Sequence, residues 1–300
     1  MHAFLIISHN NFKQLARLIE LLDSIEHDIY IHIDKKSRNV DLNLIRKSAS
    51  KSKIYMIERK GVSWGDYSTI DCEIRLMKAA LCGNNYQYLH LLSGADMLIK
   101  SHNYLHDFFD RNNGKQFLHF ESKILRKEEE EKIKYWFLLQ YFVGKSRRES
   151  LLYCIQRGLV AIQKYLHIER HRNLNILFYK GANWASITSE FAKYVVEQEK
   201  WIYKIFCYSN CGDEFFLQTL LMNSKFKYQL YLNSFNNDYL GCMRYIDWNR
   251  GGPYVFRISD YNDLISSDYI FARKFDETVD NKIIQKIVEY VKNENEKEKA

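Results

Sequence analysis

The stretch "GDEFFLQTLLMNS" (212–224) places two carboxylates, Asp213 and Glu214, directly before an apolar run. Acidic residues in the first turn of a helix complement the positive end of its dipole, so helix capping is one interpretation. Helical spacing also puts Glu214 on the same face as Leu217 and Leu221. A carboxylate on such a half-apolar face is partly desolvated, which raises its pKa toward the range of a general base. Catalysis is therefore the second interpretation.

Three tryptophans at loop positions could contact a ligand. Trp64, followed by Gly65, comes after a candidate strand, Trp184 precedes a capped helix, and Trp248 ends the segment "RYIDW". An aromatic face suits a ligand ring or the apolar C–H patches of a sugar. The alternative for Trp64 and Trp184 is a place in the core.

The elements that must hold these residues alternate along the first half of the chain. Apolar runs typical of strands and amphipathic spacing typical of helices occupy, in order, 3–8 (strand), 12–22 (helix), 28–34, 53–58 (strands), 67–81 (helix), 86–94 and 115–121 (strands). This alternation predicts an α/β fold with a mostly parallel central sheet flanked by helices. Ligands bind at the carboxyl ends of such strands, which places His9, Asp34, Ser93 and Asp96 near one rim.

Residues 123–172 interrupt this pattern. From 151 onward apolar residues recur with helical spacing, and Arg147, Arg148 and Arg157 lie around that stripe. A basic amphipathic helix can lie on an anionic membrane surface, so 145–172 is a candidate for peripheral membrane contact. The alternative is a helix that packs its stripe on the core and keeps a solvated basic face.

Composition excludes several classes of protein. The chain has 300 residues, 46% of them hydrophobic, but no apolar run of the roughly 18 residues that a membrane span needs. The N-terminus lacks the features of a signal peptide, so a cytoplasmic protein with reduced cysteines is expected. A zinc site that includes Cys207 and Cys211 is the alternative for the closest cysteine pair. Neither a Rossmann glycine motif nor a P-loop occurs.

The formal charge of +7 suggests an anionic partner, such as a nucleic acid, a phosphorylated small molecule or membrane lipid. A nucleic-acid-binding protein is the remote alternative, and no finger, RNP or helix-turn-helix signature supports it. No repeat or flexible linker divides the chain, which indicates a single domain over 1–300.

The order of the chemistry-bearing segments resembles the core-2/I-branching β-1,6-N-acetylglucosaminyltransferase family, which also includes peptide O-xylosyltransferases and bacterial enzymes. The segments that carry the resemblance are "IHIDKKS" (31–37), "VSWGDYS" (62–68), "YLHLLSGADMLIKS" (88–101), "GANWASIT" (181–188), "DEFFLQTLLMNS" (213–224), "RYIDW" (244–248) and "FARKFD" (271–276). The anchor and stem of the animal enzymes are not found in the sequence. The resemblance therefore implies a bacterial member, which would act in surface polysaccharide synthesis from the cytoplasmic side.

The resemblance implies a GT-A-like, inverting enzyme that uses a UDP-sugar without a metal. UDP-GlcNAc is the first expectation for the donor, and UDP-glucose, UDP-galactose or UDP-xylose is the alternative. The acceptor would be a glycan or a lipid-linked glycan. The implied halves are a nucleotide-sugar-binding part at about 1–122 and an acceptor and catalytic part at about 176–300, separated by a helical insert at about 123–175.

Glu214 matches the catalytic base of the family, in agreement with its semi-desolvated position. The resemblance assigns Lys274 to the donor diphosphate, with help from its neighbour Arg273 and from an upstream Arg, for which Arg257 is the nearest candidate. No Asp-x-Asp metal motif occurs in the sequence, so fixed cations would have to neutralise the leaving group. The alternative for Arg273 and Lys274 is a solvated surface pair.

The remaining assignments follow the same resemblance. On the donor side, Asp34 would contact the nucleotide, with a turn residue as its alternative, and Trp64 and Gly65 would line the site. On the acceptor side, Asp96 would either hold sugar hydroxyls or fix its own loop. The other residues expected on the acceptor side are Trp184, Asp213 and Trp248.

Overall fold

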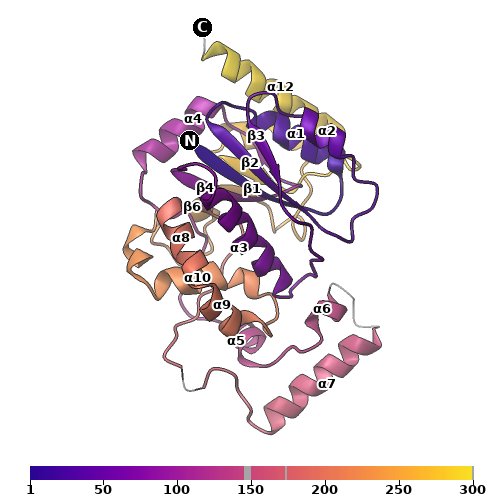
Figure 1. The fold of residues 1–300 in the computed structure, drawn as a ribbon, viewed down its shortest axis with the longest axis vertical. Coiled ribbons are helices and arrows are strands. Elements are labelled where there is room, and N and C mark those ends of the chain that lie inside the picture. The colour runs from indigo at the N-terminus through magenta and orange to yellow at the C-terminus, as the bar shows by residue number, and fades with distance from the viewer. Residues whose placement is uncertain (145–149, 173, 299–300) are drawn as a thin grey trace.

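A five-stranded sheet, in the order β3-β2-β1-β4-β6, forms the centre of the computed structural model, which describes residues 1–144, 150–172 and 174–298 (Figure 1). β1 (His2–Ser8) pairs in parallel with β2 (His27–Ile33) and with β4 (Tyr88–Ser93), and β2 pairs in parallel with β3 (Lys53–Met56). The short β6 (Ser186–Thr188) runs antiparallel to β4. The predicted α/β fold with a mostly parallel sheet is confirmed.

Alternating side chains of the strands enter two separate cores. In β1, Phe4 and Ile6 contact one hydrophobic cluster, whereas Ala3 and Leu5 contact the cluster on the opposite face. This is the period-2 alternation of a strand that is covered on both faces, and it explains why the strands have nearly continuous apolar sequences.

Helices from both ends of the chain cover the first face of the sheet. They are α1 (Phe12–Leu22), α2 (Leu42–Lys47), α4 (His102–Arg111), α11 (Tyr261–Ser266) and α12 (Asn281–Lys297). The C-terminal α12 packs against α1 (Figure 1). The two implied halves of the chain therefore share this core.

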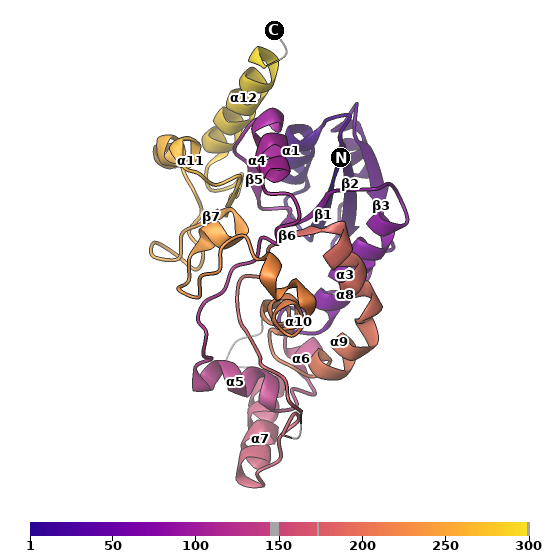
Figure 2. The same ribbon diagram turned by 90° about the vertical axis from the view of Figure 1, so that its left-hand side faces the viewer.

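The other face of the sheet is covered by α3 (Ser68–Leu81), α8 (Ser189–Glu197), α9 (Glu199–Phe206) and α10 (Phe216–Met222). A small second sheet lies beside the first, with β8 (Phe271–Arg273) between β5 (Met97–Leu98) and β7 (Arg244–Ile246) (Figure 2). Short 3-10 turns occupy Gly212–Glu214, Lys225–Gln229, Tyr239–Cys242 and Ile258–Asp260.

The prediction of a strand at 115–121 is wrong. Only two isolated bridges form there, between Gln116 and Leu230 and between Phe117 and Ser186. β6 offers only three residues, of which Ser186 exchanges both backbone hydrogen bonds with Phe117, so no ladder can extend along this segment.

The predicted helical insert contains α5 (Lys127–Lys134), α6 (Gln140–Val143) and α7 (Leu151–Tyr165), which lie at the lower end of the molecule in Figure 1. Arg147 and Arg148 lie outside the described residues. The alternative of a helix that packs its apolar stripe on the core is wrong, because Gln156 is the one buried residue of α7 and Leu151 and Ile162 are exposed. No described helix combines the length and apolarity that crossing a bilayer requires.

Candidate active site

The rim of the sheet positions Asp34 beside the end of β1. The backbone amide of Asp34 donates to Ser8 O over 2.9 Å. Its carboxylate oxygen Oδ1 accepts hydrogen bonds from the amides of Lys36 at 2.9 Å and Val62 at 3.3 Å, and the residue is only 9% exposed. These bonds hold Asp34 in a turn and tie the end of β2 to the loop that leads to Trp64, and its contact with the nucleotide stays a prediction.

The Trp64–Gly65 loop connects this rim to the segment that carries Glu214. Gly65 has φ of +71°, and its carbonyl accepts the amide of Cys211 at 2.8 Å. A Cβ atom at this position would lie 2.9 Å from Asn210 Oδ1, so both the backbone conformation and the close approach require glycine. Trp64 itself is 55% exposed and free to contact a ligand.

Glu214 ends the 3-10 turn Gly212–Glu214, with its side chain 33% exposed. Its Oε2 atom lies 3.4 Å from the ammonium of Lys132 and 3.7 Å from that of Lys180. Its carbonyl accepts the amide of Gly181 at 2.9 Å, which joins the turn to the "GANW" segment. A part-exposed carboxylate held between two cations is thus the centre of the candidate site.

The local geometry corrects the predicted helical face. Cys211 has φ of +55° and Phe215 has φ of −124°, so neither residue has α-helical geometry. The helix α10 starts only at Phe216, and Glu214 does not share a helical face with Leu217 and Leu221. Lys132 and Lys180, and not an apolar helical face, therefore determine the electrostatic environment of the Glu214 carboxylate.

Lys180 is a site residue that the sequence prediction missed. Its side chain is 9% exposed and pairs with Glu121, with Glu129 at 3.4 Å and with Glu214. Burial lowers the pKa of Lys180, but the bond to Glu121 and the charge of Glu214 outweigh it, so the pKa is raised overall. Lys180 directly precedes Gly181, the first residue of the "GANW" segment, and this position is the sequence signal that could have identified Lys180.

Asp213 was predicted on the acceptor side, but its carboxyl group is directed into the interior. Its Oδ1 atom is buried without a hydrogen-bond partner. Burial, together with the neighbouring charge of Glu214, raises the pKa of Asp213 to about 7. The carboxyl acts electrostatically on the fully buried Glu73 of α3, a residue to which the sequence assigned no role.

Asp96, predicted on the acceptor side, is buried, and Arg273, predicted on the donor side, is largely buried. Asp96 is 0% exposed and accepts hydrogen bonds from the amide and hydroxyl of Ser93, both at 2.9 Å. Arg273 Nε lies 3.5 Å from Asp96 Oδ1, and the guanidinium lies 4.1 Å from the ring centroid of Trp184. Of the two roles left open for Asp96, the structure therefore supports the structural one. Arg273 fixes Trp184 in place and is not a solvated surface residue.

Lys274 and Arg257 are brought together by a backbone hydrogen bond. The amide of Phe256 donates to Lys274 O over 2.9 Å, which places the residue before Arg257 beside Lys274. Arg257 is exposed and Lys274 is half-buried. Among the described residues, no carboxylate forms an ion pair with the ammonium of Lys274 or the guanidinium of Arg257, so both cations are available to an anionic ligand.

Tyr239 links Trp248 to Glu214. Burial raises the pKa of the Tyr239 hydroxyl, as does the charge of Glu214, whereas Trp248, which is 52% exposed, lowers it. The ring of Tyr239 stacks on His119 with centroids 4.0 Å apart, which fixes its plane. An aromatic surface therefore lies beside the candidate base, as a sugar-binding site requires.

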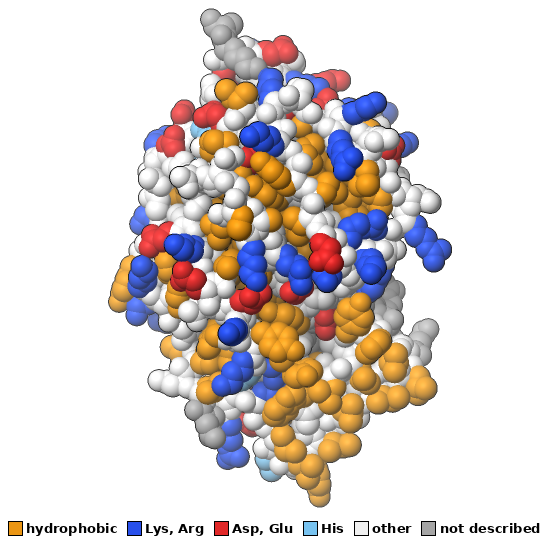
Figure 3. Space-filling view, viewed as in Figure 1, with side chains coloured by type: hydrophobic (Ala, Val, Ile, Leu, Met, Phe, Trp, Pro, Cys, Tyr) orange, Lys and Arg blue, Asp and Glu red, His pale blue; other side chains and the backbone are white. Residues whose placement is uncertain are grey.

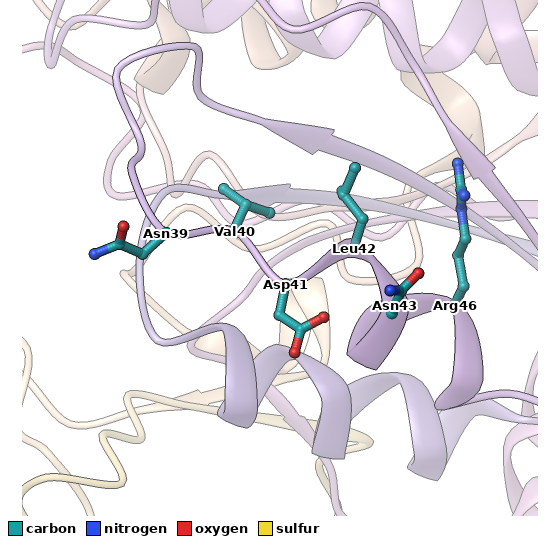
Figure 4. Close-up of a pocket in the computed structure, with 6 residues that line it drawn as sticks. All are labelled: Asn39, Val40, Asp41, Leu42, Asn43 and Arg46. Carbon is teal, nitrogen blue, oxygen red and sulfur yellow. The ribbon is translucent and has the colours of Figure 1, made fainter.

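Within the described part of the chain, no group of three or more His, Cys, Asp and Glu side chains could hold a metal ion, and none of the six cysteines forms a disulfide. A hollow at the start of α2 contains none of the predicted site residues (Figure 4). It is lined by Asn39, Val40, Asp41, Leu42, Asn43 and Arg46.

Comparison with known proteins identifies the family of the chain. The family model "Core-2/I-Branching enzyme" matches residues 2–264. Xylosyltransferase 2 of Rattus norvegicus is 24% identical, in an alignment that covers 94% of this chain and 33% of the relative. Xylosyltransferase oxt of Drosophila melanogaster is 22% identical, in an alignment that covers 96% of this chain and 33% of the relative. The chain thus spans about a third of the length of these relatives. The crystal structure of mouse xyloside xylosyltransferase 1, apo form, aligns over 91% of this chain and 97% of its own, with a TM-score of 0.39 and 11% identity. The chain belongs to the Core-2/I-Branching enzyme family of glycosyltransferases.

Proposed function

We propose that the protein transfers a sugar from a UDP-sugar to a hydroxyl of a glycan acceptor in a single inverting displacement, which forms a β-linkage. The observation that carries this proposal is the part-exposed carboxylate of Glu214, held between Lys132 and Lys180 and next to exposed aromatic side chains. Glu214 removes the proton of the attacking hydroxyl, and the nucleotide departs from the opposite side of the anomeric carbon.

The leaving diphosphate needs positive charge, and we assign this role to Lys274 and Arg257. Neither cation is neutralised by a carboxylate among the described residues, and their segments are joined through the Phe256–Lys274 hydrogen bond. Preorganised cations of this kind can stabilise a developing charge by several kcal/mol. Because the sequence has no Asp-x-Asp motif, the proposed transfer is metal-independent.

Two candidate sugar donors are each supported by a different observation. The motifs resemble N-acetylglucosaminyltransferases, which favours UDP-GlcNAc, whereas the curated relatives are named xylosyltransferases, which favours UDP-xylose. Release of UDP in the presence of UDP-GlcNAc, UDP-xylose, UDP-glucose and UDP-galactose, measured separately, identifies the donor. The donor that gives the highest kcat/KM for hydrolysis is then used in transfer assays.

Replacement of the base tests the mechanism. Glu214→Gln keeps the size of the side chain but cannot accept the proton, so transfer is expected to fall by roughly 10²- to 10⁴-fold while UDP binding is retained. Glu190→Gln is the matched control, because Glu190 forms only an exposed ion pair with Lys225. Transfer by Glu214→Gln at the rate of the control would contradict the assignment of the base.

We also propose that α7 and the neighbouring α6 lie on an anionic membrane surface that faces the cytoplasm, where a lipid-linked glycan would be presented. Hydrophobic side chains gather over α6 and α7 at the lower end of the molecule (Figure 3). The most exposed of them are Phe142 (69%), Leu151 (74%), Ile162 (55%), Tyr165 (84%) and Leu166 (55%). The inward side of α7 is polar, since Gln156 bonds Leu139 N and Gln140 there.

Charge supports a bilayer as the partner of this surface. Arg157 adds positive charge to α7, whereas Lys164 pairs with Glu131 at 2.6 Å, and each basic residue near an anionic bilayer contributes about 1 kcal/mol. Leu151→Glu/Ile155→Glu/Ile162→Glu is expected to abolish sedimentation with phosphatidylglycerol vesicles and to leave transfer to a soluble acceptor intact. The control Ile25→Glu/Tyr228→Glu/Val279→Glu changes exposed apolar residues elsewhere and should still sediment. Dimerisation of the wild type without vesicle binding would show instead that α7 joins two copies of the chain.

A further inference from the structure

Two buried glutamines of the helical insert form a hydrogen-bonded chain that ends at the candidate site. Gln156 of α7 accepts the amide of Leu139 at its Oε1 atom over 2.9 Å, and its Nε2 atom donates to Gln140 Oε1 of α6 over 2.8 Å. Gln140 Nε2 in turn donates to the backbone carbonyl of Trp64 over 3.1 Å. Gln140 is 4% exposed and Gln156 is 5% exposed. Side chains shielded from water therefore join α7 to the Trp64–Gly65 loop.

The backbone groups at its two ends fix the direction of this glutamine chain. A backbone amide only donates and a carbonyl only accepts, so Leu139 N requires the oxygen of Gln156, and Trp64 O requires the nitrogen of Gln140. The remaining nitrogen of Gln156 then meets the remaining oxygen of Gln140. Neither amide can turn over without leaving buried polar atoms unpaired, which is costly. The two glutamines therefore hold their geometry together.

The loop at the end of the glutamine chain supports the segment that leads to the base. A Cβ atom on Gly65 would lie 3.0 Å from Gln140 Nε2, so α6 packs directly on this loop. The carbonyl of Gly65 accepts the amide of Cys211 at 2.8 Å, and Cys211 immediately precedes the turn Gly212–Glu214. The insert thus reaches the base through one further backbone hydrogen bond.

We propose that Gln140 is a positioning residue for the proposed transfer, and that Gln156 acts on the site through Gln140. The bond from Gln140 holds the backbone of Trp64, which keeps the exposed ring directed to the donor and keeps the carbonyl of Gly65 in place for Cys211. A loop released from α6 binds the donor less well and leaves the turn of the base less firmly held. The inference rests on the proposed role of the Trp64–Gly65 loop in donor binding.

Donor kinetics test the positioning role. Gln140→Met and Gln156→Met keep about the same side-chain size and remove the hydrogen bonds. Each should lower kcat/KM for the UDP-sugar roughly 3- to 10-fold, as expected for one lost hydrogen bond, with most of the change in KM. Because both act through one contact, the double variant should have the kcat/KM of Gln140→Met alone. Unchanged kcat/KM in Gln140→Met, or additive losses in the double variant, would overturn the proposal.

Gln163→Met is the matched control. Gln163 also lies on α7, and its side chain bonds the backbone amide of Trp136 at 2.8 Å and the carbonyl of Trp136 at 3.0 Å. Loss of these bonds disturbs the insert but not the Trp64–Gly65 loop. Gln163→Met should therefore lower the melting temperature and leave kcat/KM unchanged. An equal loss of kcat/KM in Gln163→Met and Gln140→Met would overturn the positioning role, because any disturbance of the insert would then act on transfer.

Hydrogen exchange tests the loop without any need for activity. The amide of Cys211, which is protected by Gly65 O, should exchange roughly 3- to 10-fold faster in Gln140→Met and Gln156→Met than in the wild type, and at the wild-type rate in Gln163→Met. Gln156→Met gives this result even if Gln140→Met fails to fold. Equal protection in all these proteins would overturn the proposal. Faster exchange together with undiminished transfer by Glu214→Gln would refute the proposed base and leave the glutamine chain standing.

Discussion

Five histidines meet at the end of the sheet opposite the candidate site, and they make the stability of the protein depend on pH in a predictable way. His2 Nδ1 lies 2.9 Å from His90 Nε2, and His27 Nε2 lies 2.9 Å from His106 Nε2. The ring of the fifth histidine, His102, makes a T-shaped edge contact with the ring of His27. Desolvation lowers the pKa of His2 to about 3 and those of His27 and His90 well below their ordinary value.

Proton linkage determines whether the free energy of unfolding rises or falls with pH. In the unfolded chain a histidine binds a proton as the pH falls through about 6.5, whereas the buried histidines stay neutral in the native state. The unfolded state then binds more protons, so each of His2, His27 and His90 lowers the free energy of unfolding by about 1 kcal/mol for every pH unit below that point. Glu73 and Asp213 act in the opposite direction, because the native state keeps their protons at a pH where the unfolded chain has lost them.

Single substitutions separate these opposing contributions. Between about pH 5.5 and 7, His90→Gln should reduce the loss of stability on acidification by about 1 kcal/mol per pH unit, and Glu73→Gln should increase it by a similar amount. His167→Gln, at an exposed position, is the control and should leave the slope unchanged. Urea unfolding followed by tryptophan fluorescence gives the free energy at each pH. A slope for His90→Gln equal to that of the wild type would refute the claim that His90 stays neutral in the folded protein.

Three further outcomes are expected. Lys274→Ala should weaken UDP binding roughly tenfold or more, measured by calorimetry, because it removes a charge-assisted contact to the diphosphate; an unchanged affinity would exclude Lys274 from the donor site. Arg273→Gln should lower the free energy of unfolding by about 3 kcal/mol, since it leaves the buried Asp96 without its cation, and should change UDP affinity little. Transfer should survive EDTA, and its abolition by EDTA with rescue by manganese would contradict the metal-independent mechanism.

The sequence was sufficient to predict those parts of the fold that depend on local periodicity. The helix predicted at 12–22 has the same bounds as α1, and the strands around β1, β2 and β4 lie within one or two residues of their predicted positions. Each is an apolar segment whose own pattern determines which side is buried. The segment 115–121 also contains apolar residues, but whether it forms a strand depends on a partner far along the chain, and the three residues of β6 are too few.

The candidate site depends on contacts that no local pattern contains. Lys180 meets Glu121, 59 residues earlier, and Glu214, 34 residues later. Asp96 reaches Arg273 because β5, which begins one residue after Asp96, pairs with β8, which ends at Arg273. A single sequence shows the residue types of such pairs but not that the fold brings them together.

Exposure divides the motif residues into two groups that the sequence could not distinguish. Glu214, Trp64 and Trp248 are between one third and just over half exposed, whereas Asp96 is fully buried and the side chain of Arg273 is 13% exposed. Both groups occur in the same short segments, because a residue that touches substrate must be held by neighbours that do not. The exposed members are therefore expected to act on substrate, and the buried ones to act through stability and position. The pairing of Arg273 with Trp184 has this second role.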